Sequence, residues 1–377
     1  MTQRLLSLDA FRGFTIAAMV LVNNPGDWSH LYPQLEHAKW NGWTFTDTIF
    51  PFFLFIGGVS MALSLGRLAA AGVNKPILLR KLAVRALIIF MIGFLLNLIP
   101  NFNFAAVRIP GVLQRIALCT LLAAPIVVYC SWRQQMVWIA ALLAGYGILM
   151  LGVDVPGFGA GVLEPGKDLG AHIDRLLLGN HLWVQSKTWD PEGLLSTMPA
   201  LAGQLIGVLC GRWLLTATPR ADQTIWMLLS GLLLLALGSI LDAVLMPINK
   251  SLWTPSFCLW MSGWALIAFG AFYWLLDGTA SEPVRARATR WTTPFVIYGM
   301  NALFIFALSG LIAKMLGFIK LTQPDGSLLS LGKVLYGPLQ TLGLAPVNTS
   351  LLYALLFNAL MFAIAYGMWR KQWYVKV

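Results

Sequence analysis

Charged residues are scarce in this sequence, where they make up 11% of 377 residues. A soluble globular domain carries about 25%. Hydrophobic residues make up 58% of the chain and gather in long continuous runs, such as residues 227–241. These runs do not alternate in polarity, which excludes a β-barrel, and they are long enough to cross a bilayer as helices. We therefore expect an all-α, polytopic integral membrane protein.

Several chemical signatures are also absent. The four cysteines have no CxxC spacing, so we expect neither a disulfide framework nor a metal site. The sequence has no Walker loop, Rossmann fingerprint, HExxH motif or GxSxG motif, and the corresponding chemistries lack a site. The net charge of +11 includes no basic run interleaved with aromatic residues. We therefore expect no nucleic-acid partner, and we expect the basic residues to set the membrane topology.

Ten membrane spans can be drawn in a single domain of residues 1–377. They cover roughly residues 8–24, 47–68, 80–99, 112–131, 135–153, 194–216, 224–246, 253–276, 292–313 and 349–369. No cleavage pattern follows the first run, so it is expected to be a retained span. Basic residues are dense in the short loops on the N-terminal side of the membrane. The positive-inside rule then predicts that both termini, including Arg4 and Lys376, face the cytoplasm.

One apolar piece is ambiguous. Residues 328–344 are punctuated by proline and glycine. They suit a re-entrant helix, an interfacial helix or an eleventh span. An eleventh span would put the basic C-terminal tail outside, against the positive-inside rule.

The first sixty residues offer the most chemistry. Asp9 and Arg12 share a helix face, where they form a structural ion pair or present Arg12 to a phosphate or carboxylate. His37 is the one histidine that lies between charged residues next to a span, and histidine exchanges protons near neutral pH. Asn23 offers an amide donor for a developing oxyanion. A loop histidine is more often solvated surface, so both interpretations stay open on these residues alone.

Other polar residues lie at or inside predicted spans. Arg115 either faces the bundle interior with a partner or extends to the nearby interface. Two loop segments on the outer side of the membrane are polar; one contains Asp190 and Glu192, and the other contains Asn249 and Lys250. Each of these segments equally suits the start of a helix. Asn301 lies among apolar residues, where an amide normally bonds across helices.

Six motifs carry a resemblance to a known family. They are SLDAFRGFTIAAMVLVNN, EHAKWNGWTFTDTIFPFFLFIGG, RIPGVLQRIAL, WDPEGLLSTMPAL, INKSLWTPSF and TTPFVIYGMNAL, in this order from about Ser7 to Asn301. Together they resemble the transmembrane acetyltransferase family of heparan-α-glucosaminide N-acetyltransferase. The chain begins at the SLDAFRG span, so the resemblance implies a compact bacterial form without the luminal N-terminal domain of the lysosomal enzyme.

The resemblance implies transfer of an acetyl group from cytoplasmic acetyl-CoA to an amino sugar of the glucosamine type on the other side of a bacterial inner membrane. It assigns catalysis to His37, as base or acetyl carrier, and to Asn23. Asp47 or Glu36 would orient the imidazole. The other implied roles are donor binding by Arg12, Arg115, Gln114 and Asn301, and acceptor binding by Trp40, Asn41, Asp190, Glu192, Asn249 and Lys250. Family members also suggest a homodimer.

A transporter for N-acetylglucosamine or a related sugar is the alternative that fits the composition. It should carry ionisable or helix-breaking residues near the midplane of its spans. Here the span centres are nearly free of charge, and polar residues gather at the outer ends. This placement favours an enzyme. A purely structural scaffold would leave the cluster of His37, Trp40 and Asn41 without a role.

Overall fold

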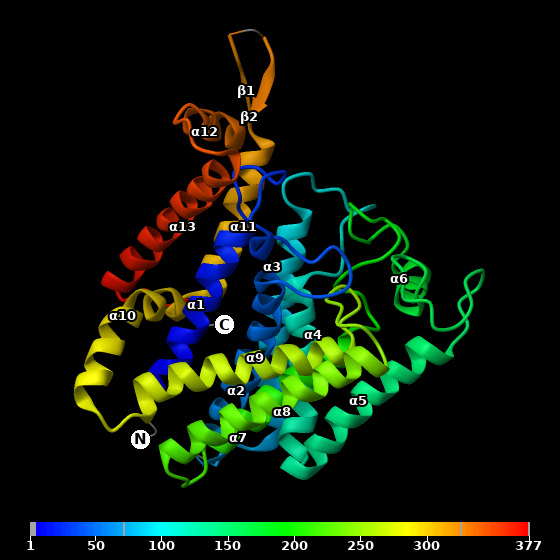
Figure 1. The fold of residues 1–377 in the computed structure, drawn as a ribbon, viewed down its shortest axis with the longest axis vertical. Coiled ribbons are helices and arrows are strands. Elements are labelled where there is room, and N and C mark those ends of the chain that lie inside the picture. The colour runs from blue at the N-terminus through cyan, green and yellow to red at the C-terminus, as the bar shows by residue number, and fades with distance from the viewer. Residues whose placement is uncertain (1–4, 71, 325, 376–377) are drawn as a thin grey trace.

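The computed structural model describes residues 5–70, 72–324 and 326–375, so Arg4 and Lys376 lie outside the described residues. Figure 1 shows long helices packed at various tilts, with loops gathered at one side. The helices are α1 (Leu6–Val22), η1 (Pro33–Leu35), α2 (Phe45–Ala70), α3 (Lys75–Leu98), α4 (Val112–Tyr129), α5 (Trp132–Gly152), α6 (Leu169–Leu178), α7 (Thr197–Leu214), α8 (Arg220–Val244), α9 (Pro255–Tyr273), η2 (Trp274–Gly278), α10 (Glu282–Met300), α11 (Ala302–Phe318), α12 (Leu331–Gln340) and α13 (Pro346–Arg370). Strands β1 (Lys320–Thr322) and β2 (Leu328–Ser330) form an antiparallel hairpin.

The prediction of an all-α, multi-pass membrane protein is confirmed. Seven helices in the described ranges are long and apolar enough to cross a membrane, and they are α2, α3, α4, α5, α8, α9 with η2, and α13. The pair α10 and α11, bent by 72°, adds an eighth if it forms one span. Each of the ten predicted spans coincides with a helix or with this pair. Two of these helices, α1 and α7, are not among those that are long and apolar enough to cross a membrane. Helix α1 has only 17 residues, and α7 carries the polar Gln204 and Arg212.

Contacts between loops sort the helix ends into two faces. On the first, named the loop face, lie segments 23–44, 99–111, 153–196 and 245–254. Hydrogen bonds join these segments, including Ile109 N to His181 O and Gly42 N to Ile248 O. On the second, named the basic face, lie the start of α1, the α4–α5 and α7–α8 connections and η2. There Arg212 donates to the carbonyl of Cys130.

Helices α1 and α7 both connect these two faces. The Ser7 amide at the start of α1 donates to Asp277 on the basic face, whereas Gly26, just after α1, donates to the Ser350 carbonyl where α13 begins. The number of membrane crossings stays a prediction. Which face meets the cytoplasm stays a prediction.

The ambiguous segment 328–344 is not a span. It folds as strand β2 followed by α12, a helix of 10 residues. At 1.5 Å per residue, α12 covers about 15 Å, half of a bilayer's hydrocarbon thickness. In Figure 1 the β1–β2 hairpin and α12 project beyond the end of α11.

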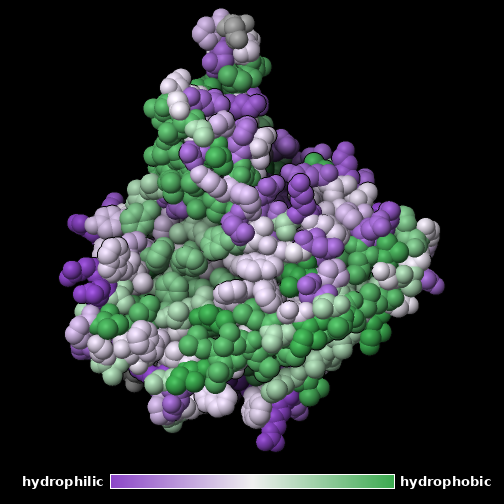
Figure 2. Space-filling model, in the orientation of Figure 1, coloured by the Kyte–Doolittle hydropathy of each residue, from purple (hydrophilic) through white to green (hydrophobic). Residues whose placement is uncertain are grey.

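The central helices bury aromatic side chains, and the outer helices face the bilayer. Phe11 of α1, Phe55 of α2 and Phe269 of α9 are fully buried and pack together. In contrast, most of the apolar surface of α5 and α8 is exposed. Figure 2 shows a band of hydrophobic side chains over α5, α7 and α8 and polar groups over the loops. Such a surface suits lipid tails.

Helices α1 and α10 touch through two glycines. A Cβ added to Gly13 would lie 1.6 Å from the Phe295 carbonyl oxygen, and one added to Gly299 would lie 2.0 Å from the Asp9 carbonyl oxygen. Only a residue without a side chain permits this approach, which is a common way to pack helices inside membranes.

We expect Gly13→Ala to lower the thermal unfolding midpoint in detergent, because overpacking a tight contact costs about 1–3 kcal/mol. The matched control is Gly310→Ala in α11, where an added Cβ meets nothing within 4 Å. That control should be neutral or stabilising, since alanine favours helices by about 1 kcal/mol over glycine. Equal effects of the two substitutions would contradict the tight contact.

Candidate active site

His37 and Asp47 form a hydrogen-bonded pair on the loop face. The distance from His37 Nδ1 to Asp47 Oδ1 is 2.6 Å. The imidazole is half exposed, whereas the Asp47 carboxylate is completely buried. Because an ionised carboxylate only accepts hydrogen bonds, it favours the tautomer with a proton on Nδ1. The lone pair of Nε2 is then the basic position of His37.

The local sequence holds Asp47 in one orientation. Its Oδ2 atom accepts hydrogen bonds from the amides of Ala38 and Thr44, at 3.1 and 3.0 Å, and from Thr44 Oγ1 at 3.1 Å. Thr44 immediately precedes α2, and a side chain three residues on that accepts from its amide is typical of a capping box. The same contacts that start α2 therefore fix the partner of His37.

A second histidine–aspartate pair in the same loop lacks this support. His30 Nδ1 lies 2.7 Å from Asp27 Oδ2, but the Asp27 side chain is one-third exposed. The Ser29 amide and His30 both lower the pKa of Asp27. Water competes for this carboxylate, so it constrains its histidine less than Asp47 does. The two pairs provide a matched comparison within one loop.

The two other residues predicted near His37 are on the surface. Asn23 is exposed at the end of α1, while the neighbouring Asn24 is buried and donates its amide to Val20 O at 2.7 Å. The side chain of Asn23 is therefore accessible to solvent, unlike that of Asn24. Glu36 is exposed, and its backbone carbonyl accepts a bond from Thr44 Oγ1. The structure thus pairs Asp47, not Glu36, with the imidazole.

Three predicted acceptor residues connect the loops around this pair. Trp40 Nε1 donates to the Leu163 carbonyl at 2.8 Å. Asn249, fully buried, donates from Nδ2 to Asn41 Oδ1 at 3.1 Å. These bonds fix the positions of loops 23–44, 153–196 and 245–254 relative to one another.

Lys250 is near two carboxylates. It is half-buried and close enough to interact electrostatically with both Asp47 and Glu192. The structure therefore brings the His37 pair and the acidic segment 190–192 into one electrostatic neighbourhood, although they are far apart in the sequence.

Asp190 and Glu192 form a buried ion cluster rather than an open acceptor mouth. Arg108 donates to Asp190 Oδ2 at 2.8 Å and Oδ1 at 2.5 Å, and to Glu192 Oε2 at 2.5 Å. Burial raises the pKa of Glu192, but the charges of Arg108, Lys250 and Arg115 together outweigh burial and hold the pKa below its usual value. Neither carboxylate is free to meet a soluble ligand. The sequence places Arg108 at the start of a motif but does not reveal this partner.

Arg115 of α4 also holds the segment that contains Asp190 and Glu192. It is fully buried and donates to the carbonyls of Pro191 and Gly193 and to Ser196 Oγ. Its guanidinium also lies 5.3 Å from the centre of the Trp253 ring, a cation–π contact. These contacts face the acidic segment, which differs from the donor-lining position expected for Arg115.

A cavity of about 130 Å³ lies between α1, α2, α3, α4 and α11. Arg12 and Arg85 line its end toward the basic face, and Met19 and Phe53 line it toward the loop face. Arg12 also bonds Ser60 Oγ at 2.8 Å and Asp9 Oδ1 at 3.2 Å. Arg12 is therefore both an ion-pair partner and a cavity residue. The sequence did not single out Arg85 or Ser60 for this position.

Gln114 and Asn301 lie beside this cavity but do not line it. Gln114 is buried, and its oxygen packs against Gly93 and Gly111. Asn301 occupies the bend between α10 and α11, where Nδ2 donates to Trp373 O at 3.0 Å and Oδ1 accepts from Val375 N at 2.9 Å. The amide of Asn301 thus holds the C-terminal segment, which differs from the expected donor contact.

These features define a class: a multi-pass helical membrane protein with a histidine–aspartate pair at one face and a cavity between its helices that two arginines line. Comparison with known proteins identifies the family within this class. Residues 4–224 match the model of the catalytic region of heparan-α-glucosaminide N-acetyltransferase. The chain belongs to this family.

Two curated relatives have the same name. The heparan-α-glucosaminide N-acetyltransferases of Homo sapiens and Mus musculus are 31% and 30% identical to the chain over 359 residues. Each alignment covers 80% of the chain and 52% or 53% of the relative. The chain thus spans about half the length of the curated relatives it matches.

We expect Arg108→Gln to destabilise the protein by about 3–5 kcal/mol, because it leaves two buried carboxylates without their cation. Adding Asp190→Asn and Glu192→Gln should restore much of the loss by removing those charges. Thermal unfolding in detergent measures both effects. A triple variant no more stable than Arg108→Gln would contradict the ion cluster.

Asp174 should make stability depend on pH. Burial raises the pKa of this carboxyl from 3.8 to about 6. Between these two pH values the folded state therefore binds more protons than the unfolded state. The stability that protonation of Asp174 contributes is fully present below about pH 4 and is lost as the pH rises through about 6. Asp174→Asn removes this titration, so its midpoint should rise relative to wild type between pH 4 and pH 7. A difference that does not vary with pH would contradict the raised pKa.

Proposed function

We propose that the chain transfers an acetyl group from acetyl-CoA on its basic face to an amino sugar on its loop face. The observation that carries this proposal is the His37–Asp47 pair, whose buried carboxylate leaves the outer imidazole nitrogen as a base. Membership in an N-acetyltransferase family supports the reaction class. The dense basic residues support a basic face in the cytoplasm and a loop face outside a bacterial inner membrane.

In this mechanism the amine nitrogen of the sugar attacks the carbonyl carbon of the thioester. His37 takes a proton from the amine through Nε2, and Asp47 stabilises the imidazolium that forms. Asn23 donates a hydrogen bond to the oxyanion of the tetrahedral intermediate. The carbon–sulfur bond then breaks, and the leaving sulfur receives the proton from His37. The products are the acetamido sugar and CoA.

On the donor side, we assign Arg12 and Arg85 to the anionic or polar parts of acetyl-CoA. Both line the cavity toward the basic face, and guanidinium groups suit phosphate. The cavity of about 130 Å³ suits a narrow acyl-carrying arm and not a nucleotide, so the nucleotide would remain at the basic surface.

On the acceptor side, we assign contact with the sugar to Trp40, Asn41 and Lys250, which border the loops around His37. Asp190, Glu192 and Asn249 instead hold the walls of this region, because each is buried with its polar atoms paired. Arg115 and Asn301 have the same supporting role for their segments.

We expect His37→Ala to lower acetyl transfer to glucosamine by about 100-fold to 10,000-fold, the usual contribution of a general base. Asp47→Asn should also lower it strongly, since it removes the charge that selects the tautomer. The matched control is His30→Ala, which disrupts the exposed pair in the same loop and should leave transfer unchanged. The assay is labelled acetyl-CoA with purified protein in detergent.

Each failure has a distinct meaning. Full activity in His37→Ala would keep the reaction and reject this site. No transfer by wild type to any amino sugar, together with uptake of N-acetylglucosamine into liposomes without CoA, would replace the enzyme with a transporter.

A further inference from the structure

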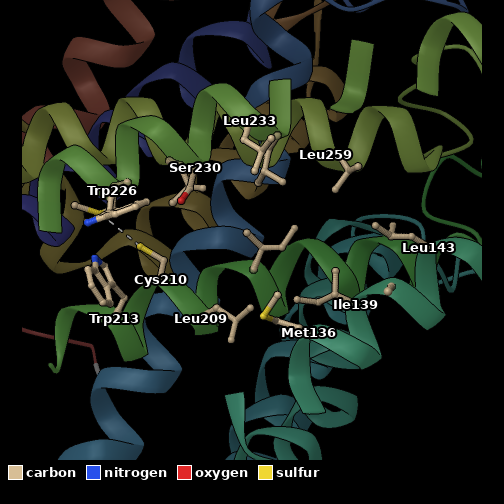
Figure 3. A pocket seen from close by; sticks show the side chains of 15 residues that line it. Met136, Ile139, Leu143, Leu209, Cys210, Trp213, Trp226, Ser230, Leu233 and Leu259 are labelled. Carbon is tan, nitrogen blue, oxygen red and sulfur yellow. Dashed lines mark hydrogen bonds between the residues drawn. The ribbon is translucent and has the colours of Figure 1, made fainter. Parts of the chain in front are cut away.

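An apolar groove runs along the outside of the bundle, on the opposite side of α7 from α2. It has a volume of about 570 Å³ and is lined by side chains of α5, α7, α8 and α9. Figure 3 shows Met136, Ile139 and Leu143 along one wall, with Ser230 and Leu233 along another. Nearly all of the side chains that line the groove are apolar, so it does not suit a soluble polar ligand.

The groove opens toward the bilayer. Leu233 and Trp226 on its rim are 60% and 57% exposed, and they belong to a helix long and apolar enough to cross a membrane. Its lining on α8 runs from Trp226 to Leu234, which is about 12 Å at 1.5 Å per residue. One leaflet of a bilayer has about 15 Å of hydrocarbon. The groove therefore matches the depth of the lipid tails of a single leaflet.

One end of the groove is at the basic face. Trp213 lies in the last turn of α7, and Arg212 beside it donates to the carbonyl of Val127 in α4 and to that of Cys130 just after α4. The exposed guanidiniums of Arg133 and Arg220 stand at the first turns of α5 and α8, the two helices that flank this end. Basic residues at the level of the headgroups attract anionic lipids.

The groove also contains polar groups near that end. The Trp213 indole Nε1 is buried and has no hydrogen-bond partner among the described residues. Figure 3 shows Trp213 and Trp226 together at one end, with the Ser230 hydroxyl turned toward the space between α8 and α7. Tryptophan side chains are enriched at the level of lipid headgroups, which agrees with this end of the groove lying at the basic face.

We propose that this groove binds one anionic phospholipid, with its tails along α5, α7 and α8 and its phosphate near Arg133 and Arg220. Two observations favour this occupant over a helix of a second copy. Basic residues stand at one end of the groove, where an anionic headgroup would lie, and the length of the groove matches the tails of one leaflet.

The test uses the full chain purified in detergent, with native mass spectrometry after addition of phosphatidylglycerol or of phosphatidylcholine with the same tails. Wild type should retain one phosphatidylglycerol. Ala140→Trp fills the groove and should lower retention at least tenfold. Its matched control is Ala141→Trp, exposed on the same helix but outside the groove, which should retain the lipid. Ala140→Phe serves as a smaller filling substitution if Ala140→Trp does not fold.

The headgroup is tested separately. Arg133→Gln should lower the preference for phosphatidylglycerol over phosphatidylcholine about fivefold, which corresponds to about 1 kcal/mol for one basic residue at an anionic lipid. The control is Arg287→Gln on α10, which does not line the groove.

Three outcomes would overturn the proposal. Equal lipid loss from Ala140→Trp and Ala141→Trp would mean non-specific lipid at the helix surface. Equal retention of both lipids by wild type would show that the groove does not select an anionic headgroup. Conversion of a dimer to a monomer by Ala140→Trp, without loss of lipid, would identify the groove as a contact between copies.

Discussion

A charge inside an apolar bundle must have its partners within reach, and this constraint organises the whole loop face. Asp47 is buried, and its two oxygens accept bonds from His37, Ala38 and Thr44. Removing an ion from water without such partners would cost several kcal/mol. The loop between α1 and α2 therefore folds around this carboxylate, and the position of the imidazole is a consequence of that folding.

The same constraint explains the second ion cluster. Asp190 and Glu192 come from one loop, and the guanidinium that neutralises them comes from another, just before α4. Arg115 then uses the backbone carbonyls of the acidic segment as acceptors. A loop that would otherwise be mobile gains a fixed shape from two arginines. Lys250 joins this cluster electrostatically to Asp47, so the two parts of the loop face share one charge balance.

The sequence was a good guide to helices and a weaker guide to orientation. Runs of apolar residues fix where helices form, because the backbone has no other way to satisfy its polar groups in lipid. The motif order also led to His37 and offered Asp47 or Glu36 as its partner, and the structure pairs the imidazole with Asp47. Rotation of a helix about its axis is set by packing, which the runs do not encode. Arg115 is the clearest case: its neighbours Val112, Leu113 and Ile116 face the cavity, and it does not.

Long-range polar partners were also beyond the sequence. Nothing in the segment around Arg108 indicates that its guanidinium meets residues more than eighty positions later. Asn301 was expected to bind a ligand, but its amide holds backbone atoms of the C-terminal segment. Such pairings depend on which loops meet at a face, and that depends on the packing of the entire bundle.

The glycine contact between α1 and α10 has a consequence for the reach of a substrate. Arg12 and Asn23 belong to one unbroken helical stretch, so about 16 Å along the axis separates them. The helix itself fixes this distance, and Gly13 and Gly299 hold it against α10 at backbone distance, so its position in the bundle is fixed as well. In the proposed reaction the length of α1 then sets the minimum length of the arm that carries the acyl group. A thioester anchored at Arg12 must carry its acyl group on an arm at least that long, and a shorter carrier would bind without reaching the acceptor.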